Sequence, residues 1–321
     1  MMPILTAIAT GDPDEPAANV TGIDPDGYLV TDPATRGVGE LGPAAVPLGP
    51  VLSVFDPMFI GIDEFGHPVY LPMIYRNILI GGEPGSGKSA LLNLLVAHAA
   101  LSLDCRLCLV DGKRVELGQW RDCADAFAVS LDQALATLQR LQTVMDNRYA
   151  YLDAQRPSRR KVTRDDAFRP ILLAVDEIAY YSATVGDRKT QELFSAWLRD
   201  LVARGRAVGV MVAAATQRPS SDIIPTSLRD LFAWRFAGRC TTDVSSDIVL
   251  GHGWKDRGWS SNTISPNNPG AGLLIAEGGT PQLVKTAYLS DVDCARIAGY
   301  AADIRRTARL ADRPSGGERV A

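Results

Sequence analysis

Apolar runs and stretches of helical periodicity alternate along the chain from residue 77 onward. The runs are short and end in glycine or polar residues, as buried strands do. In the stretch 131–152, apolar side chains recur every three or four residues, a spacing that places them on one face of a helix. We therefore predict a mostly parallel α/β sheet covered by helices on both faces. The predicted strands are 77–80, 106–110, 171–175, 209–215, 234–237 and 272–276, and the predicted helices are 131–152, 191–203 and about 290–309.

The segments outside this alternating pattern differ in composition. Residues 1–50 are rich in Pro, Gly and Asp, which predicts an irregular arm with one hairpin at most. Residues 60–71 contain two short apolar stretches around a turn at 64–66, which predicts a small β element in front of the main sheet. We expect one α/β domain over 51–310 and a flexible tail over 311–321.

Charge is distributed unevenly along the chain. Seven acidic residues and one basic residue, Arg36, give the arm six net negative charges, and because the whole chain carries −4, residues 51–321 carry +2. A nearly neutral domain does not predict a broadly basic nucleic-acid surface, so any contact with a polyanion has to be local. The five cysteines are odd in number and scattered, which suits a reducing cytoplasm. Runs of about 18 uncharged apolar residues do not occur, so we expect no transmembrane segment.

A phosphate-binding loop follows the first predicted strand of the main sheet. The stretch Gly82-Glu-Pro-Gly-Ser-Gly-Lys-Ser fits G-x-x-x-x-G-K-[ST] and lies between an apolar strand and an apolar helix, the context that the motif requires. Glycines let successive backbone N–H groups point at phosphate oxygens, and the helix N-terminus adds positive charge. Lys88 is expected on the β- and γ-phosphates. The residues predicted to hold ATP are Gly82, Glu83, Pro84, Gly85, Ser86, Gly87, Lys88, Ser89 and Ala90.

Two carboxylates, Asp176 and Glu177, end the predicted strand 171–175. A parallel strand delivers its C-terminal residues to the edge where nucleotides bind, so we expect Asp176 and the Ser89 hydroxyl to hold Mg²⁺. Glu177 is then placed to polarise the attacking water. Between the phosphate loop and this acidic strand the chain has another strand, 106–110, which favours a RecA-like P-loop NTPase over a kinase or small GTPase. Thr216 and Gln217 end the next strand, where a hydroxyl or carboxamide could sense the γ-phosphate.

These motifs follow one another in the order of a known family. From about residue 60 to residue 290 the chain resembles the motor domain of the FtsK/SpoIIIE proteins. The resemblance implies a hexameric ring that hydrolyses ATP to pump double-stranded DNA through its pore, with Arg206 as the arginine finger and Gln217 as the sensor. Besides the phosphate loop, it rests on Asp111-Gly-Lys-Arg-Val-Glu-Leu, Met145-Asp-Asn-Arg-Tyr, Ala174-Val-Asp-Glu-Ile, Arg206-Ala-Val-Gly, Ala215-Thr-Gln-Arg-Pro-Ser and Ala287-Tyr-Leu-Ser-Asp.

The resemblance also suggests which residues contact DNA. Arg218 and Arg229 match basic positions of the family's first DNA loop, and Arg239 is a further candidate contact. Two later positions that are usually basic are Asp243 and Asp247 in this chain, and acids repel phosphate. The basic stretch 156–164 fits a compensating DNA surface and, equally well, a solvated loop.

Several functions fit this motif set. A stand-alone motor of this layout resembles the conjugative transfer proteins of actinobacterial plasmids and integrative elements, which implies a cytoplasmic motor, docked at the membrane through a protein partner. A protein-export ATPase of the type VII secretion kind shares the motif order but engages polypeptide. A nucleotide-dependent assembly switch without turnover is the third reading, and the presence of Glu177 and Gln217 argues against it.

Overall fold

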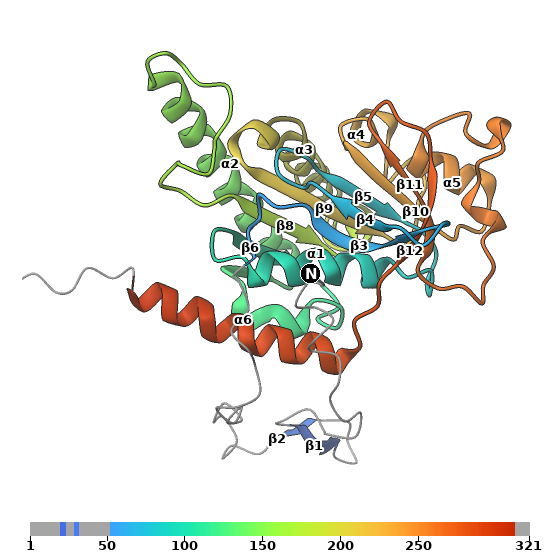
Figure 1. Cartoon of the computed structure of the whole chain (residues 1–321), viewed down its shortest axis with the longest axis horizontal. Coiled ribbons are helices and arrows are strands. Elements are labelled where there is room, and N and C mark those ends of the chain that lie inside the picture. The colour runs from blue at the N-terminus through green and yellow to red at the C-terminus, as the bar shows by residue number, and fades with distance from the viewer. Residues whose placement is uncertain (1–19, 24–28, 32–51, 312–321) are drawn as a thin grey trace, which may run out of the picture.

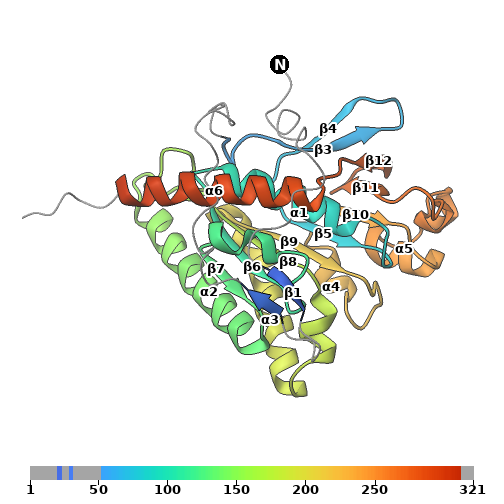
Figure 2. The same cartoon turned by 90° about the horizontal axis from the view of Figure 1, so that it is seen from below.

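The computed structural model describes residues 20–23, 29–31 and 52–311. Within residues 52–311 the strands form one ten-stranded sheet, in the order β4-β3-β12-β11-β10-β5-β9-β8-β6-β7 (Figure 2). The strands are β3 (Met58–Asp63), β4 (Pro68–Leu71), β5 (Ile78–Gly81), β6 (Arg106–Val110), β7 (Ala126–Ala128), β8 (Ile171–Val175), β9 (Val210–Thr216), β10 (Trp234–Gly238), β11 (Ala271–Ala276) and β12 (Gln282–Thr286).

The half of the sheet from β10 to β7 is parallel. Its central strands β5, β8 and β9 are buried along their whole length, as expected where helices cover both faces. The phosphate loop follows β5, and the neighbour of β5 in the sheet is β9. The acidic strand β8 lies on the other side of β9. This order is that of a RecA-like P-loop fold, so the predicted fold class is confirmed.

The other half of the sheet is antiparallel. Strands β10 to β11, β11 to β12, β12 to β3 and β3 to β4 all pair in that way, and the small β element predicted at 60–71 is the hairpin β3–β4 at the sheet's outer edge. Two strands were missed. Strand β7 has only three residues, and β12 alternates exposed and buried positions with Gln282 and Lys285 facing solvent, so neither gives a sustained apolar run.

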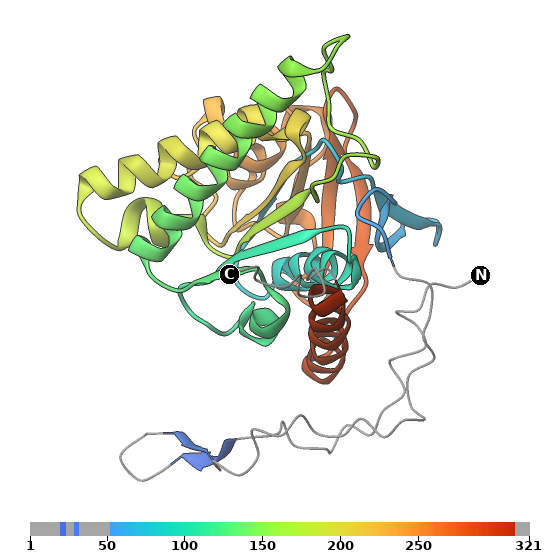
Figure 3. The same ribbon diagram turned by 90° about the vertical axis from the view of Figure 1, so that its left-hand side faces the viewer.

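Helices cover the two faces of the sheet in separate groups (Figures 1 and 3). One face packs against α1 (Lys88–Leu101), the short helix η3 (Gly118–Cys123) and the C-terminal helix α6 (Asp291–Ala311). The other face packs against α2 (Leu131–Ala154), α3 (Arg188–Arg204), α4 (Thr226–Arg229) and α5 (Asp243–Leu250). None of the helices among residues 52–311 combines the length and the apolar composition needed to span a bilayer.

Local sequence explains where the long helices begin. The Ser130 hydroxyl accepts a hydrogen bond from the Gln133 amide at the start of α2, and the Asp187 carboxylate does the same for Thr190 at the start of α3. Both therefore pair an amide that the helix leaves without a partner.

Little of the predicted arm and tail belongs to the described residues. Strands β1 (Val20–Ile23) and β2 (Leu29–Thr31) pair antiparallel, which matches the single hairpin allowed for the arm. The remainder of 1–50 and residues 312–321 lie outside the described residues, and so does the flexible tail predicted there.

Candidate active site

The loop between β5 and α1 has the backbone of a phosphate cradle. Gly82, Gly85 and Gly87 have φ of 152°, 75° and 93°, values that residues other than glycine rarely adopt. A Cβ on Gly87 would lie 2.4 Å from the backbone of Gly270, in the loop before β11. The loop thus owes its path both to glycine conformations and to close packing against a segment far away in sequence.

Lys88 is buried at the N-terminus of α1. Its Nζ donates a hydrogen bond to the Glu83 carbonyl at 2.7 Å, so the ammonium lies over the curl of the loop. Burial lowers the pKa of Lys88 to about 8, although the nearby Glu177 and Asp176 carboxylates favour its charged form. A bound phosphate would stabilise the charged form of Lys88, as the Glu177 and Asp176 carboxylates do in its absence.

Asp176 lies in an environment that is unfavourable for a carboxylate. It follows β8 and is 6% exposed, and its Oδ2 accepts no hydrogen bond from the part of the chain that the structure describes. Burial, and after it the repulsion by the like charges of Asp111 and Glu116, raises the pKa of Asp176 to about 7. A divalent cation would remove both costs at once, so the residues present fit Mg²⁺. Ser89, on the first turn of α1, is the hydroxyl ligand expected by sequence.

Glu177 is held in place by the neighbouring strand. Its Oε1 accepts a hydrogen bond from the Thr216 hydroxyl at 2.7 Å, and its Oε2 accepts one from the Gln217 backbone amide at 2.9 Å. Thr216 is the last residue of β9, which lies beside β8, and Gln217 follows it directly. Thr216 therefore positions Glu177, a role that the sequence did not predict for it. Gln217 contacts Glu177 through its backbone amide and not through its side-chain carboxamide. The signal for Thr216 was its place at the tip of the strand beside the acidic strand.

Arg239 lies at the phosphate loop. It comes directly after β10, and its guanidinium forms an ion pair with Glu83, whose other carboxylate oxygen accepts a hydrogen bond from the Thr241 hydroxyl at 2.8 Å. The Glu83 amide also donates to the Arg239 carbonyl at 2.9 Å. Arg239 therefore braces the loop between β5 and α1, and its contact with DNA stays a prediction.

The other two predicted DNA contacts differ in exposure. The Arg218 side chain is 68% exposed in the loop after β9 and forms an ion pair with Asp222 at 3.5 Å. Arg229 is buried, with a side chain 6% exposed and an ion pair to Asp230 at 2.8 Å. Arg218 therefore presents its charge to solvent, whereas the charge of Arg229 is buried and paired within the protein.

The acids that replace the usual basic positions stabilise the segment after α5. Asp243 accepts a hydrogen bond from the Ser260 hydroxyl at 2.7 Å and forms an ion pair with Lys255 at 3.0 Å. Asp247 accepts hydrogen bonds from the amides of Gly253 at 3.1 Å and Lys255 at 3.2 Å. Their carboxylates are thus engaged in holding the chain over 253–260.

Arg206 lies at the N-terminal ends of the parallel strands, whereas the phosphate loop lies at their C-terminal ends. It belongs to the turn η5 (Gly205–Val208), which precedes β9, whereas the phosphate loop follows β5, and β5 and β9 are parallel. Its Nε donates to the Tyr75 carbonyl at 3.0 Å, and its Nη2 lies 3.3 Å from Glu277 Oε2. Arg206 therefore cannot reach the phosphate loop of its own chain. The basic stretch 156–164 lies at the same N-terminal ends, where Val162 donates to the Ala207 carbonyl.

Comparison with known sequences finds similarity to FtsK/SpoIIIE proteins. The sequence model of the FtsK/SpoIIIE family matches residues 44–169. Two relatives, both named DNA translocase FtsK, are 28% identical: the Treponema pallidum protein over 76% of this chain and 31% of its own length, and the Corynebacterium efficiens protein over 77% and 28%. The chain therefore spans about a third of the length of these relatives.

Solved structures show the same fold at lower identity. The conjugation coupling protein TcpA of pCW3 superposes with a TM-score of 0.64 at 20% identity, covering 78% of this chain and 71% of that one. The cytoplasmic domain of the type VII secretion ATPase EccC from Thermomonospora curvata superposes with a TM-score of 0.58 at 21% identity, over 79% and 32%. At these identities the similarity establishes the fold alone.

Proposed function

We propose that this chain, which carries an FtsK/SpoIIIE-family domain, is an ATP-driven translocase of double-stranded DNA that acts in conjugative transfer or DNA segregation. The observation that carries the chemistry is the end of β8. There Asp176 has a buried, unpaired oxygen and Glu177 is fixed by the end of β9. One carboxylate is suited to a cation and the other to orienting a water molecule, as ATP hydrolysis requires.

The chain's own residues would divide the work as follows. The phosphate loop and Lys88 hold the β- and γ-phosphates, and Ser89 and Asp176 hold Mg²⁺, which supplies charge neutralisation when bound. Glu177 orients the water for in-line attack on the γ-phosphate. The Thr216 hydroxyl and the Gln217 amide keep that carboxylate at the correct angle, so little reorganisation is needed during the reaction.

The position of Arg206 supports a ring. Because it lies at the sheet edge remote from its own phosphate loop, it can act on ATP only in a neighbouring subunit. A closed, head-to-tail ring gives every finger a neighbouring site, and a hexamer is the form expected from the family. We place this ring on the cytoplasmic side of a membrane, docked through a protein partner.

Duplex DNA is the proposed substrate, held with few phosphate contacts. Among the candidate basic contacts, Arg218 is the exposed one, so binding should depend only weakly on salt. The test is the ATPase rate of the assembled protein with and without linear duplex DNA at low salt. We expect stimulation by duplex, and loss of that stimulation in Arg218→Ala with little change in the basal rate. An assembled, ATP-hydrolysing ring that is indifferent to duplex would overturn the proposal in favour of polypeptide export.

A further inference from the structure

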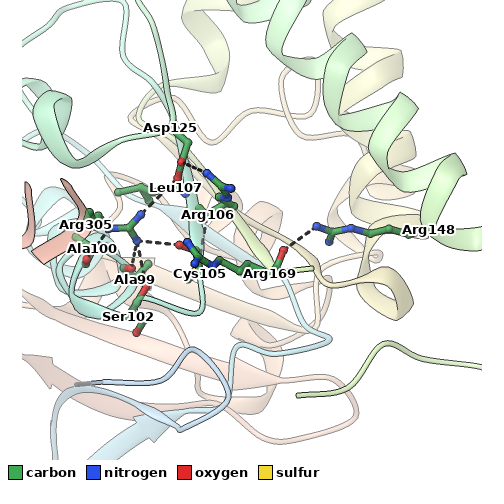
Figure 4. Close-up of polar contacts among 10 residues, drawn as sticks. All are labelled: Ala99, Ala100, Ser102, Cys105, Arg106, Leu107, Asp125, Arg148, Arg169 and Arg305. Atoms are coloured by element: carbon green, nitrogen blue, oxygen red, sulfur yellow. Dashed lines mark hydrogen bonds and ion pairs between the residues drawn. The ribbon is translucent and has the colours of Figure 1, made fainter. Parts of the chain in front are cut away.

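Arg148, on α2, is a buried arginine whose hydrogen bonds go to two backbone carbonyls from separate segments. Its Nη1 donates to the Val208 carbonyl at 2.8 Å, and its Nη2 donates to the Arg169 carbonyl at 2.7 Å. Figure 4 shows the second of these bonds. The guanidinium also lies over the Phe168 ring, 4.6 Å from its centre, which fixes its plane. The side chain is thus held rigidly, and it holds two segments together.

The first segment is the turn that carries Arg206. From Arg204 to Gly209 every backbone carbonyl accepts a hydrogen bond. The donors are the Tyr149 hydroxyl to residue 204, the Gly209 amide to residues 205 and 206, the Val162 amide to residue 207, Arg148 to residue 208 and the Ile171 amide to residue 209. Two adjacent residues of α2, Arg148 and Tyr149, therefore supply side-chain donors on both sides of Arg206.

The second segment leads into β8. Arg169 is two residues before β8, which Asp176 and Glu177 follow directly. Val208 is two residues before β9, which ends at Thr216 and is followed by Gln217. At the far ends of these paired strands, Glu177 is hydrogen-bonded to the end of β9. Side chains thus connect β8 and β9 at both ends: Arg148 links the segments before the two strands, and Glu177 links the residues after them.

We propose that Arg148 is a positioning residue for the arginine finger: it sets the turn that carries Arg206, and thereby serves ATP hydrolysis in the neighbouring subunit. The inference rests on the proposed function, because it needs Arg206 to act on a neighbour's ATP. A mobile turn would lose the finger's alignment with the γ-phosphate, and a misplacement of about 1 Å costs on the order of a hundredfold in rate.

The test compares Arg148→Met with the parental protein by ATPase kinetics and by binding of a fluorescent ATP analogue. We expect kcat to fall roughly tenfold to a hundredfold, with the Kd for the analogue within about twofold of the parental value. Arg148→Lys keeps a charge but lacks the fork that reaches two carbonyls, so it should show the same pattern with a smaller loss. This second variant keeps the test open if the methionine variant does not fold.

Mixing experiments separate positioning from general damage. Arg148→Met should regain activity when mixed with Glu177→Gln, because one intact interface can form, but not when mixed with Arg206→Ala, which breaks the same side of the interface. Arg305→Met is the matched control. Arg305 is also buried and donates to backbone carbonyls, those of Ala99 and Ala100 at 2.7 Å each, but at the C-terminal end of α1 (Figure 4). We expect Arg305→Met to lower thermal stability without showing this selective recovery of activity in the mixtures.

Two results would overturn the inference, and they are distinguishable. If Arg206→Ala loses turnover while Arg148→Met and Arg148→Lys keep the parental kcat, Arg148 does not position the finger although the proposed function stands. If Arg206→Ala itself keeps the parental kcat, the finger assignment fails and this inference fails with it.

Discussion

The buried Asp176 carboxylate destabilises the folded protein when it is charged, although it must be charged to bind a cation. Its pKa, about 7 in the folded chain against 3.8 for an ordinary aspartate, means that the folded state binds more protons than the unfolded state between those values. Stability of the metal-free protein should therefore fall as pH rises from about 4 to about 7, and stay low above that. The protein retains an unfavourable buried charge that a cation would neutralise.

We predict that Asp176→Asn stabilises the metal-free protein at pH 8 by about 2 kcal/mol, because it removes the buried charge and keeps the shape. Urea denaturation in EDTA measures this, with the exposed Asp165→Asn as a control that should change little. The same variant should lose Mg²⁺-dependent ATP hydrolysis. Equal or lower stability than the parental protein would contradict the description of this carboxylate.

Lys88 and Glu177 should separate binding from turnover. Lys88→Ala removes the main side-chain charge facing the phosphates and should abolish nucleotide binding. Glu177→Gln keeps nearly the same shape and should retain binding while hydrolysis stops. Fluorescent-nucleotide titration and phosphate release measure the two steps, and parental turnover in Glu177→Gln would rule out its role in orienting water.

At the scale of elements, the two exposed or partly exposed arginines Arg218 and Arg239 should have different defects. Arg239→Ala frees Glu83 in the phosphate loop and should weaken ATP binding severalfold with or without DNA. Arg218→Ala should leave the ATP affinity unchanged and lower stimulation by duplex. Isothermal titration with ATP decides between them. Equal ATP affinity in both variants would show that the Arg239 ion pair does not organise the loop.

The sequence predicts elements better than it predicts the partners of individual side chains. The phosphate loop and the acidic strand could be located because motif and flanking periodicity agree within about twenty residues of chain. The partner of Arg239 could not, since Glu83 is far from it in sequence and the two meet only because β10 lies beside β5; the Thr241 hydroxyl reaches the same carboxylate across 158 residues. Strand β7 escaped because its pairing with β6 depends on tertiary packing and not on its three residues.

At the scale of the whole molecule, activity should require an interface between subunits. We predict that Arg206→Ala, inactive by itself, regains part of the activity when mixed with Glu177→Gln, because one complete site forms between two differently defective subunits. Specific activity should also rise with protein concentration as rings form, which sedimentation velocity detects. Constant specific activity at all concentrations, with monomers alone in sedimentation, would exclude the shared site.

The most direct measurement of the central claim is displacement of a fluorescent third strand from a linear duplex. A motor that moves along double-stranded DNA strips off a triplex-forming oligonucleotide in its path, so its release reports translocation itself. We predict release that requires ATP, starts after a delay that grows with the length of duplex before the triplex, and is absent in Glu177→Gln. Duplex-stimulated hydrolysis by an assembled ring with no release of the third strand would contradict translocation.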